Sequence, residues 1–161
     1  MQDLPQIKSI YRKIMKKMDE EQIQIWDDIY PCEFFEEDIR NGRLYLMIEN
    51  SEICSAFVLC DVSAGEKCVE WENSSAKALY LDRLGVNTAC QGKGIGSLML
   101  EKAKETAKVL EAEYLRLFVV DINVPAIRLY EKNGFQQVNG VYDEVIDEDY
   151  ILHEYGFEVK L

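Results

Sequence analysis

The sequence contains one histidine, His153, and its five cysteines include no C-x-x-C pair. Structural zinc sites are built from closely spaced cysteine and histidine ligands, so we expect no metal site. Long apolar runs are also missing: LFVV at 117–120 is far shorter than the roughly 20 residues of a membrane-spanning helix, and the N-terminus has no signal pattern. We therefore expect a cytoplasmic protein without membrane association, whose cysteines stay free thiols.

Basic residues are scarce as well. Lysine and arginine together number 18 against 30 aspartates and glutamates, which gives a formal net charge of −12. A nucleic-acid-binding protein needs a basic surface, so this class is excluded as the main function. A negative field raises the local concentration of positively charged ligands, and it also keeps a protein soluble; the charge alone does not separate these two uses.

Length and composition are those of an ordinary globular protein. The chain has 161 residues, of which 48% are apolar, and it shows no repeat, linker or low-complexity segment. We expect a single domain that covers residues 1–161.

Apolar residues recur at helical spacing in some segments and in alternating or continuous runs in others. The pattern predicts helices over 4–18, 33–41, 94–112 and 124–132, and strands over 44–50, 53–61, 77–86, 114–120 and 150–161. Residues 62–76 are turn-rich, with a short strand expected near Trp71. Because helices and strands alternate irregularly and a hairpin comes early, we expect a mixed α/β (α+β) fold.

Two finer expectations concern faces of these elements. Strict alternation along 77–86 places Asp82 on the same face as Tyr80 and Val86. The helix over 94–112 carries one apolar stripe, made of Ile95, Leu98, Met99, Ala103, Ala107 and Leu110.

Three glycines, Gly92, Gly94 and Gly96, alternate with other residues around Lys93 where this helix begins. The first N–H groups of a helix lack intrahelical partners and carry part of the positive end of the helix dipole, so they bind anions. Glycine has no Cβ and lets a phosphate approach the main chain. The pattern therefore predicts a pyrophosphate site over residues 91–97.

Two common phosphate motifs do not fit this segment. A P-loop requires serine or threonine after its lysine, but Gly94 follows Lys93. A dinucleotide fingerprint starting at Gly92 requires glycine at the position of Ser97, and no acidic residue closes the following strand at the expected distance. Nucleotide binding of either type is therefore disfavoured.

The segments LGVNTACQGKGIGSLML and NVPAIRLYEKNGF together resemble the GNAT superfamily of acetyl-CoA-dependent N-acetyltransferases. The first matches the family's Q/R-x-x-G-x-G/A loop at Gln91, Gly94 and Gly96. The second matches its N-x-x-A-x-x-x-Y-x-x-x-G-F pattern, from Asn123 to Phe135. Two independent motifs in the right order make this resemblance specific over 84–135.

The resemblance implies a mostly antiparallel sheet flanked by helices, in which two parallel strands, 78–86 and 114–120, splay apart around acetyl-CoA. Main-chain groups of the first strand would pair with the pantetheine amides; they belong to Leu84, Gly85 and Val86. The pyrophosphate would be held by Gln91, Gly92, Lys93, Gly94, Ile95, Gly96 and Ser97. Asn123 would hydrogen-bond the pantetheine arm, and Ala126 would leave room for it.

The implied reaction is attack of an amine on a thioester. An alkylamine has a pKa of about 10.4, so it must lose a proton first, and the departing thiolate must gain one. Tyr130 is the candidate acid, which the resemblance supports. Asp82 is a candidate base; Glu70, Glu72 and a chain of water molecules are alternatives.

The acceptor is expected to be a small-molecule or peptidyl amine, and the resemblance favours a homodimer. Aromatic and acidic residues in the segments that form the family's acceptor site suggest a cationic amine. They are Trp26, Tyr30, Phe34, Phe35, Tyr142, Glu36, Glu37, Asp143, Glu144, Asp147 and Glu148. A non-catalytic acyl-CoA-binding or regulatory domain of the same fold is the alternative, since the sequence shows no clear base.

Overall fold

In the computed structural model the described residues are 1–27 and 29–161. The chain divides into two compact units: unit 1 is Met1–Val58 with Arg83–Met99, and unit 2 is Leu59–Asp82 with Leu100–Leu161. Strand β4 (Ala78–Val86) and helix α3 (Ile95–Val109) each contribute residues to both units. The expectation of one domain over 1–161 stays a prediction.

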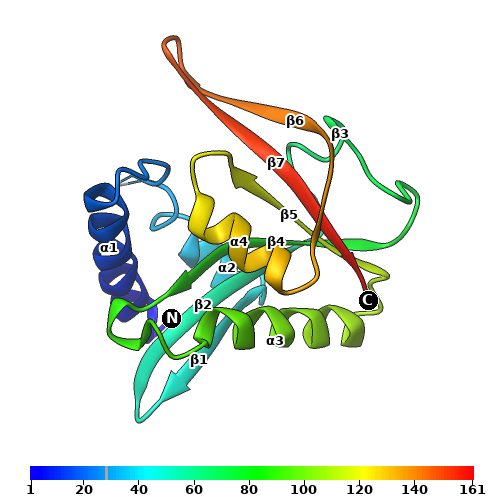
Figure 1. The fold of residues 1–161 in the computed structure, drawn as a ribbon. Helices are drawn as coiled ribbons and strands as arrows, with labels where there is room; N and C mark the ends of the chain where they lie inside the picture. Colours follow the sequence, from blue (N-terminus) through cyan, green and yellow to red (C-terminus); the bar gives the residue numbers. More distant parts are fainter. Residues whose placement is uncertain (28) are drawn as a thin grey trace. The chain divides into compact units, whose positions relative to one another are not determined.

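Seven strands form a mixed sheet in the order β1-β2-β4-β5-β7-β6-β3 (Figure 1). Besides β4, they are β1 (Leu44–Glu49), β2 (Glu52–Cys60), β3 (Val69–Glu70), β5 (Tyr114–Val120), β6 (Gln136–Asp147) and β7 (Tyr150–Lys160). The β1–β2, β3–β6, β5–β7 and β6–β7 pairs are antiparallel, and β4–β5 is parallel. The predicted mixed, mostly antiparallel α/β fold is confirmed.

The parallel pair of β4 and β5 has a short ladder. Its ladder joins Ala78–Tyr80 to Tyr114–Arg116 and ends there, although β4 continues to Val86 and β5 to Val120. β5 is a central strand, and six of its seven residues are buried. A strand of this kind requires the continuous apolar run that predicted it.

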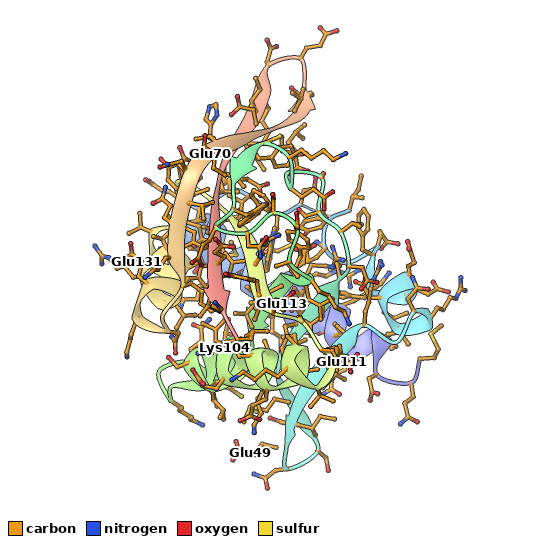
Figure 2. The ribbon with its side chains drawn as sticks, turned by 90° about the vertical axis from the view of Figure 1, so that its right-hand side faces the viewer. Glu49, Glu70, Lys104, Glu111, Glu113 and Glu131 are labelled. Atoms are coloured by element: carbon orange, nitrogen blue, oxygen red, sulfur yellow. The ribbon has the colours of Figure 1, made fainter. Side chains whose placement is uncertain are left out.

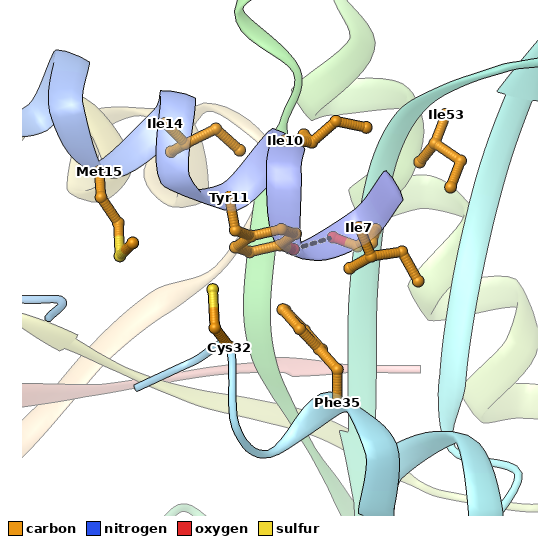
Figure 3. Close-up of a cluster of buried hydrophobic side chains, with 9 residues drawn as sticks. Ile7, Ile10, Tyr11, Ile14, Met15, Cys32, Phe35 and Ile53 are labelled. Carbon is orange, nitrogen blue, oxygen red and sulfur yellow. Dashed lines mark hydrogen bonds between the residues drawn. The ribbon is translucent and has the colours of Figure 1, made fainter. Parts of the chain in front are cut away.

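Unit 1 is built around the amphipathic helix α1 (Leu4–Glu20) and the short helix α2 (Phe35–Arg40). Their apolar faces bury a cluster with the inner side of β2, shown in Figure 3. Tyr11 lies at its centre, and its hydroxyl donates to the carbonyl oxygens of Ala56 (3.2 Å) and Arg83 (2.5 Å). A buried tyrosine needs such partners, and these two bonds join α1 to β2 and β4.

A buried ion pair lies beside this cluster. Asp38 of α2 is fully buried and accepts from Arg83 Nε (2.9 Å) and from Arg43 Nε (2.6 Å). The guanidinium of Arg83 also lies over the rings of Tyr30 and Phe34, at 5.5 and 5.6 Å from their centroids. The carboxylate is therefore compensated by two cations, as a buried charge must be.

Unit 2 contains the long β6–β7 hairpin and helix α4 (Val124–Lys132). Gly134 ends α4 with a φ of +87°, as the Asn-Gly pair predicted. Lys104, labelled on α3 in Figure 2, donates to the carbonyl oxygen of Asn133 at the end of α4 (3.2 Å). A lysine at this position complements the negative end of the α4 dipole.

Three details differ from the sequence-based expectations. The stripe on α3 was partly wrong, because Leu98 and Leu110 are 42% and 43% exposed, whereas Leu100 is fully buried. The helix ends at Val109, so Leu110 no longer follows its periodicity. Strand β6 was not predicted, because its core-facing residues are few and most of its side chains are exposed.

Among the helices that the structure describes, none is long and apolar enough to cross a membrane.

Candidate active site

The glycine loop of unit 1 has the conformation expected of an anion site. Gly92 and Gly94 have φ values of +77° and +74°, which other residues rarely adopt, and a Cβ at either position would meet nothing within 4 Å. α3 begins at Ile95, and its first α-helical bond runs from Leu98 N–H to Gly94 O (3.1 Å). The N–H groups that precede Leu98 therefore point out of the start of the helix.

One side chain at the start of this loop, that of Gln91, holds it in place. Gln91 accepts a hydrogen bond from Lys17 of α1 and donates to the carbonyl oxygen of Val86 (3.3 Å). Residues 91–94, including Lys93, are exposed, while Ile95 is buried and Gly96 and Ser97 are half-buried. The side chain of Gln91 thus orders the loop, which leaves its main chain to face a ligand.

The end of β4 presents main-chain groups on alternating sides. Asn87 N–H donates to Cys54 O of β2 (2.8 Å), and Gly85 O accepts from Ser55 Oγ of β2 (2.6 Å). Residues of opposite parity, Leu84 and Val86, therefore direct their peptide groups away from β2. Gly85 is required for packing, because a Cβ there would lie 2.7 Å from the ring of Tyr11, and pairing of pantetheine with Leu84, Gly85 and Val86 stays a prediction.

β4 is not a regular strand throughout. Arg83 has a φ of +51°, in the left-handed region, so the backbone is kinked between Asp82 and Leu84. Half-buried and buried residues still alternate from Asp82 to Val86, so the expectation that Asp82 and Val86 share a face stays a prediction. The kink turns the side chain of Arg83 into the buried pair with Asp38.

In unit 2, Asn123 and Ala126 open helix α4. The side-chain oxygen of Asn123 accepts from Ala126 N–H (3.4 Å), so Asn123 is the N-cap of the helix. Both residues are half-buried. The cap uses the oxygen of Asn123, so its amide NH₂ is the group that suits a coenzyme carbonyl.

Tyr130 follows on the same helix, two turns after Asn123. Its ring packs against Phe135 and Phe157, with centroids 5.9 and 6.4 Å apart. Burial first, and then the charge of Asp82, raise the pKa of Tyr130 well above its ordinary value. The hydroxyl therefore keeps its proton at neutral pH, which a proton donor requires.

The register of the sheet places a second carboxyl group on the face of Asp82. Tyr80 pairs with Arg116, and Arg116 with Glu158, so these three share a face. Four residues further along β5, Val120 pairs with Glu154. By the two-residue period, Glu154 and Asp82 lie on this same face of unit 2.

Glu154 of β7 is half-buried and lies between Val120, the last residue of β5, and Tyr142 of β6. Burial, followed by a hydrogen bond with Glu144 and the charges of Glu144 and Asp82, raises the pKa of Glu154 to about 8. The sequence analysis did not single out this residue. In the sequence, its position two residues after the apolar Leu152 indicated the same strand face, but the pairing with Val120 depends on register.

The other candidate bases have different contacts. Glu72 accepts a hydrogen bond from Tyr114 (3.0 Å), and Glu70 accepts from Asn139 (3.4 Å). Of the acceptor-site candidates, half-buried Glu36 pairs with Arg40, and exposed Glu37 pairs with Arg43.

The acceptor-site candidates of each unit form aromatic clusters. Trp26, Tyr30 and Phe34 are joined edge to face in unit 1, and Phe35 belongs to the buried cluster around Tyr11. In unit 2, Tyr142 packs on Phe118 at 5.9 Å. Asp143 bonds to His153 (2.7 Å), which raises the pKa of that histidine, whereas Asp147 and Glu148 are exposed at the end of the hairpin.

Comparison with known proteins shows which family this arrangement represents. The family model described as the acetyltransferase (GNAT) family matches residues 7–135, which is most of the chain. The chain belongs to the GNAT acetyltransferase family. In this GNAT chain the matched residues include β4, the glycine loop, α3 and α4 with Tyr130.

Two relatives of this chain from Bacillus subtilis are named as acetyltransferases. YwnH, named as a phosphinothricin acetyltransferase, is 27% identical over 105 residues, which cover 65% of this chain and 60% of YwnH. A spermine/spermidine N(1)-acetyltransferase is 34% identical over 73 residues, 45% of this chain and 47% of the relative. The GNAT chain thus matches about half to three fifths of these relatives' length.

Solved structures share the fold over nearly the whole chain. A GNAT acetyltransferase from Streptococcus agalactiae superposes with a TM-score of 0.78 at 19% identity and covers 99% of this chain and 91% of the other. The yncA acetyltransferase of Salmonella typhimurium, solved with acetyl-CoA, has a TM-score of 0.67 at 18% identity, covering 99% and 89%. At these identities the likeness concerns the fold.

Proposed function

We propose that this protein transfers an acetyl group from acetyl-CoA to a primary amine in a ternary complex. The observation that carries the proposal is the exposed loop of Gly92 and Gly94, whose positive φ values open the main chain in front of α3. Membership of the GNAT family supports the choice of coenzyme. The pyrophosphate is held by N–H groups of residues 91–97, with Lys93 as a cation.

Tyr130 supplies the proton that the leaving thiolate needs. A thiol has an ordinary pKa of about 8.5, so a thiolate that forms in a buried environment takes a proton readily. Tyr130 keeps its hydroxyl proton because burial and Asp82 raise its pKa. The amide of Asn123 orients the pantetheine arm for this transfer.

Asp82 and Glu154 act on the amine in different ways. The cationic amine is attracted by the charge of Asp82, and its proton passes to Glu154, whose raised pKa suits it to this task. A base is most effective when its pKa lies near the working pH. The proton leaves Glu154 to solvent before the next cycle.

The acceptor class follows from charge. A net charge of −12 and the carboxylates of Asp82 and Glu144 favour a cationic alkylamine, small or peptidyl. Relatives named for spermine, spermidine and phosphinothricin support amines as the class. A cytoplasmic location and a homodimer are part of the same proposal.

The coenzyme site is tested by replacing Gly94 with alanine. A side chain at a φ of +74° strains the loop, and its methyl group hinders the approach of a phosphate. We expect acetyl-CoA to bind about tenfold more weakly, as measured by calorimetry. Gly42→Ala is the matched control, since Gly42 has a φ of +65°, equal open space and a place outside the loop. Equal affinity in both variants would remove the loop from the site.

Glu154 is tested by its effect on the pH profile. A carboxyl group that acts as a base must be ionised, so the rate should rise with pH through about 8, the pKa of Glu154. In Glu154→Gln this inflection should vanish and kcat should fall by roughly 10²-fold. The amine's own rise toward a pKa of about 10.4 should remain.

A second variant, Glu144→Gln, tests whether the inflection belongs to Glu154. Removing the neighbouring carboxylate in Glu144→Gln lowers the pKa of Glu154, because Glu144 is a cause of its rise. The inflection should then move to lower pH with little loss of maximal rate. An inflection that stays in Glu154→Gln would assign it to another group.

A further inference from the structure

Two buried thiols of unit 1 lie in direct contact beside the coenzyme loop. Cys90 donates its S–H to Cys54, with the sulfur atoms 2.9 Å apart, and both residues are buried and unbridged. A disulfide bond is about 2.05 Å long, so the sulfur atoms need to approach by less than about 1 Å. The residues are 36 positions apart in the sequence, and neither belongs to the proposed catalytic machinery.

The backbone around both residues is already held together. Asn87 N–H donates to Cys54 O (2.8 Å), its Nδ2 donates to Ile53 O (3.0 Å), and Cys90 N–H donates to Asn87 O (2.8 Å). Cys54 lies in β2, and Cys90 ends the short 3₁₀ turn Thr88–Cys90. The two sulfur atoms therefore meet through fixed main-chain positions.

The two thiols have different environments. The hydrogen bond from Cys90 and burial raise the pKa of Cys54 to about 11, so Cys54 is a thiol at neutral pH. Cys54 also donates to Glu49 Oε2 (3.9 Å), and Figure 2 shows Glu49 at the end of the β1–β2 hairpin. Cys90 is slightly less buried, 6% against 2%, and directly precedes the exposed residues 91–94.

We propose that Cys54 and Cys90 are a site of reversible oxidation, at which a peroxide converts the thiol pair into a disulfide. Cys90 attacks the peroxide oxygen and becomes a sulfenic acid, and the peroxide leaves as water or an alcohol. Cys54 then attacks the sulfur of Cys90, the S–O bond breaks, and the departing sulfenic OH takes the proton of Cys54, with Glu49 as the relay, and leaves as water. Two thiols lose two electrons in total, and the O–O bond of the peroxide accepts them.

The consequence concerns the loop and rests on the proposed coenzyme site. Cys90 directly precedes Gln91, so drawing its sulfur toward β2 displaces the first residue of the loop. Displacements near 1 Å of a binding group have large effects on the geometry it serves. We expect the disulfide form to bind acetyl-CoA at least about tenfold more weakly than the reduced form.

The experiment uses the full chain with Cys68→Ser, which removes the exposed thiol. Reduced protein is treated with hydrogen peroxide, alkylated and digested without reductant, and a Cys54–Cys90 peptide is expected by mass spectrometry. Acetyl-CoA affinity is measured by calorimetry before oxidation, after it, and after dithiothreitol. The control adds Cys90→Ser, whose affinity should not respond to peroxide; circular dichroism verifies that it is folded.

The outcomes separate the two proposals. If the protein that keeps both Cys54 and Cys90 yields no linked peptide after peroxide treatment, the proposed oxidation site is wrong, whatever the result of the control. A linked protein that binds acetyl-CoA as tightly as the reduced one overturns the effect on the loop. Failure of the reduced protein to bind acetyl-CoA contradicts the coenzyme site, and the peptide map still tests the thiol pair.

Discussion

Replacing Tyr130 with phenylalanine is expected to lower kcat by roughly 10²- to 10⁴-fold, the range for loss of a general acid. The ring remains, so its packing on Phe135 and Phe157 is preserved. Only the hydroxyl group, whose proton would reach the leaving sulfur, is lost. The rate is measured as CoA thiol released with a saturating amine.

The affinity for acetyl-CoA distinguishes this role from a structural one. Binding in Tyr130→Phe should stay within about twofold of the unchanged protein, because an interaction made only in the transition state affects kcat and not ground-state binding. Tyr114→Phe is the matched control: it removes a hydroxyl bonded to Glu72 in the same unit and should leave kcat unchanged. Unchanged turnover in Tyr130→Phe would remove this hydroxyl from the mechanism.

The same assay addresses the non-catalytic alternative. An acyl-CoA-binding domain without turnover would bind acetyl-CoA and release no thiol with any cationic amine. The raised pKa values of Tyr130 and Glu154 argue for turnover, since groups with perturbed pKa values gather at catalytic sites. A panel of alkylamines, polyamines and peptides decides between the two.

Replacing Asp38 with alanine should lower the free energy of unfolding by about 3–5 kcal/mol. Asp38 is fully buried and compensates Arg83, whose side chain is 5% exposed, as well as Arg43. Its loss leaves the charge of Arg83 buried with the kink of β4 unsupported. Urea unfolding followed by circular dichroism measures the change in midpoint.

Glu37→Ala is the matched control for Asp38. Glu37 is on the same helix and contacts the same Arg43 at 3.3 Å, but its side chain is 64% exposed. An exposed pair contributes about 1 kcal/mol or less, so this variant should unfold nearly as the unchanged protein does. Equal losses in the two variants would show that helix α2, not burial of the charge, sets the stability.

Much of the fold followed from local pattern. The apolar spacing of α1, the continuous run of β5 and the Asn-Gly end of α4 each act over a few residues. The positive φ values of Gly92 and Gly94 were foreseeable in the same way, because only glycine adopts them without strain. Asn123 and Tyr130, seven residues apart, were placed on one helix by a spacing of two turns.

Other features needed contacts between distant residues. Leu98 and Leu110 had the right spacing for burial but are exposed. Burial depends on which side of α3 is covered by other elements, and helical spacing alone does not determine that side. Glu154 entered the candidate site through its pairing with Val120, and a shift of one residue would turn it to the other face. The kink at Arg83 exists because a buried carboxylate 45 positions away holds the guanidinium.

The sequence by itself determined the family, the glycine loop before α3 and the candidate acid Tyr130, since these depend on residue types at short, rigid spacings. Only the tertiary structure decided that Glu154 shares a face with Asp82, that Arg83 is paired with Asp38 and that Cys54 touches Cys90. Periodicity tells which side of an element a residue occupies, but its neighbours across strands are set by register and by the packing of the whole unit.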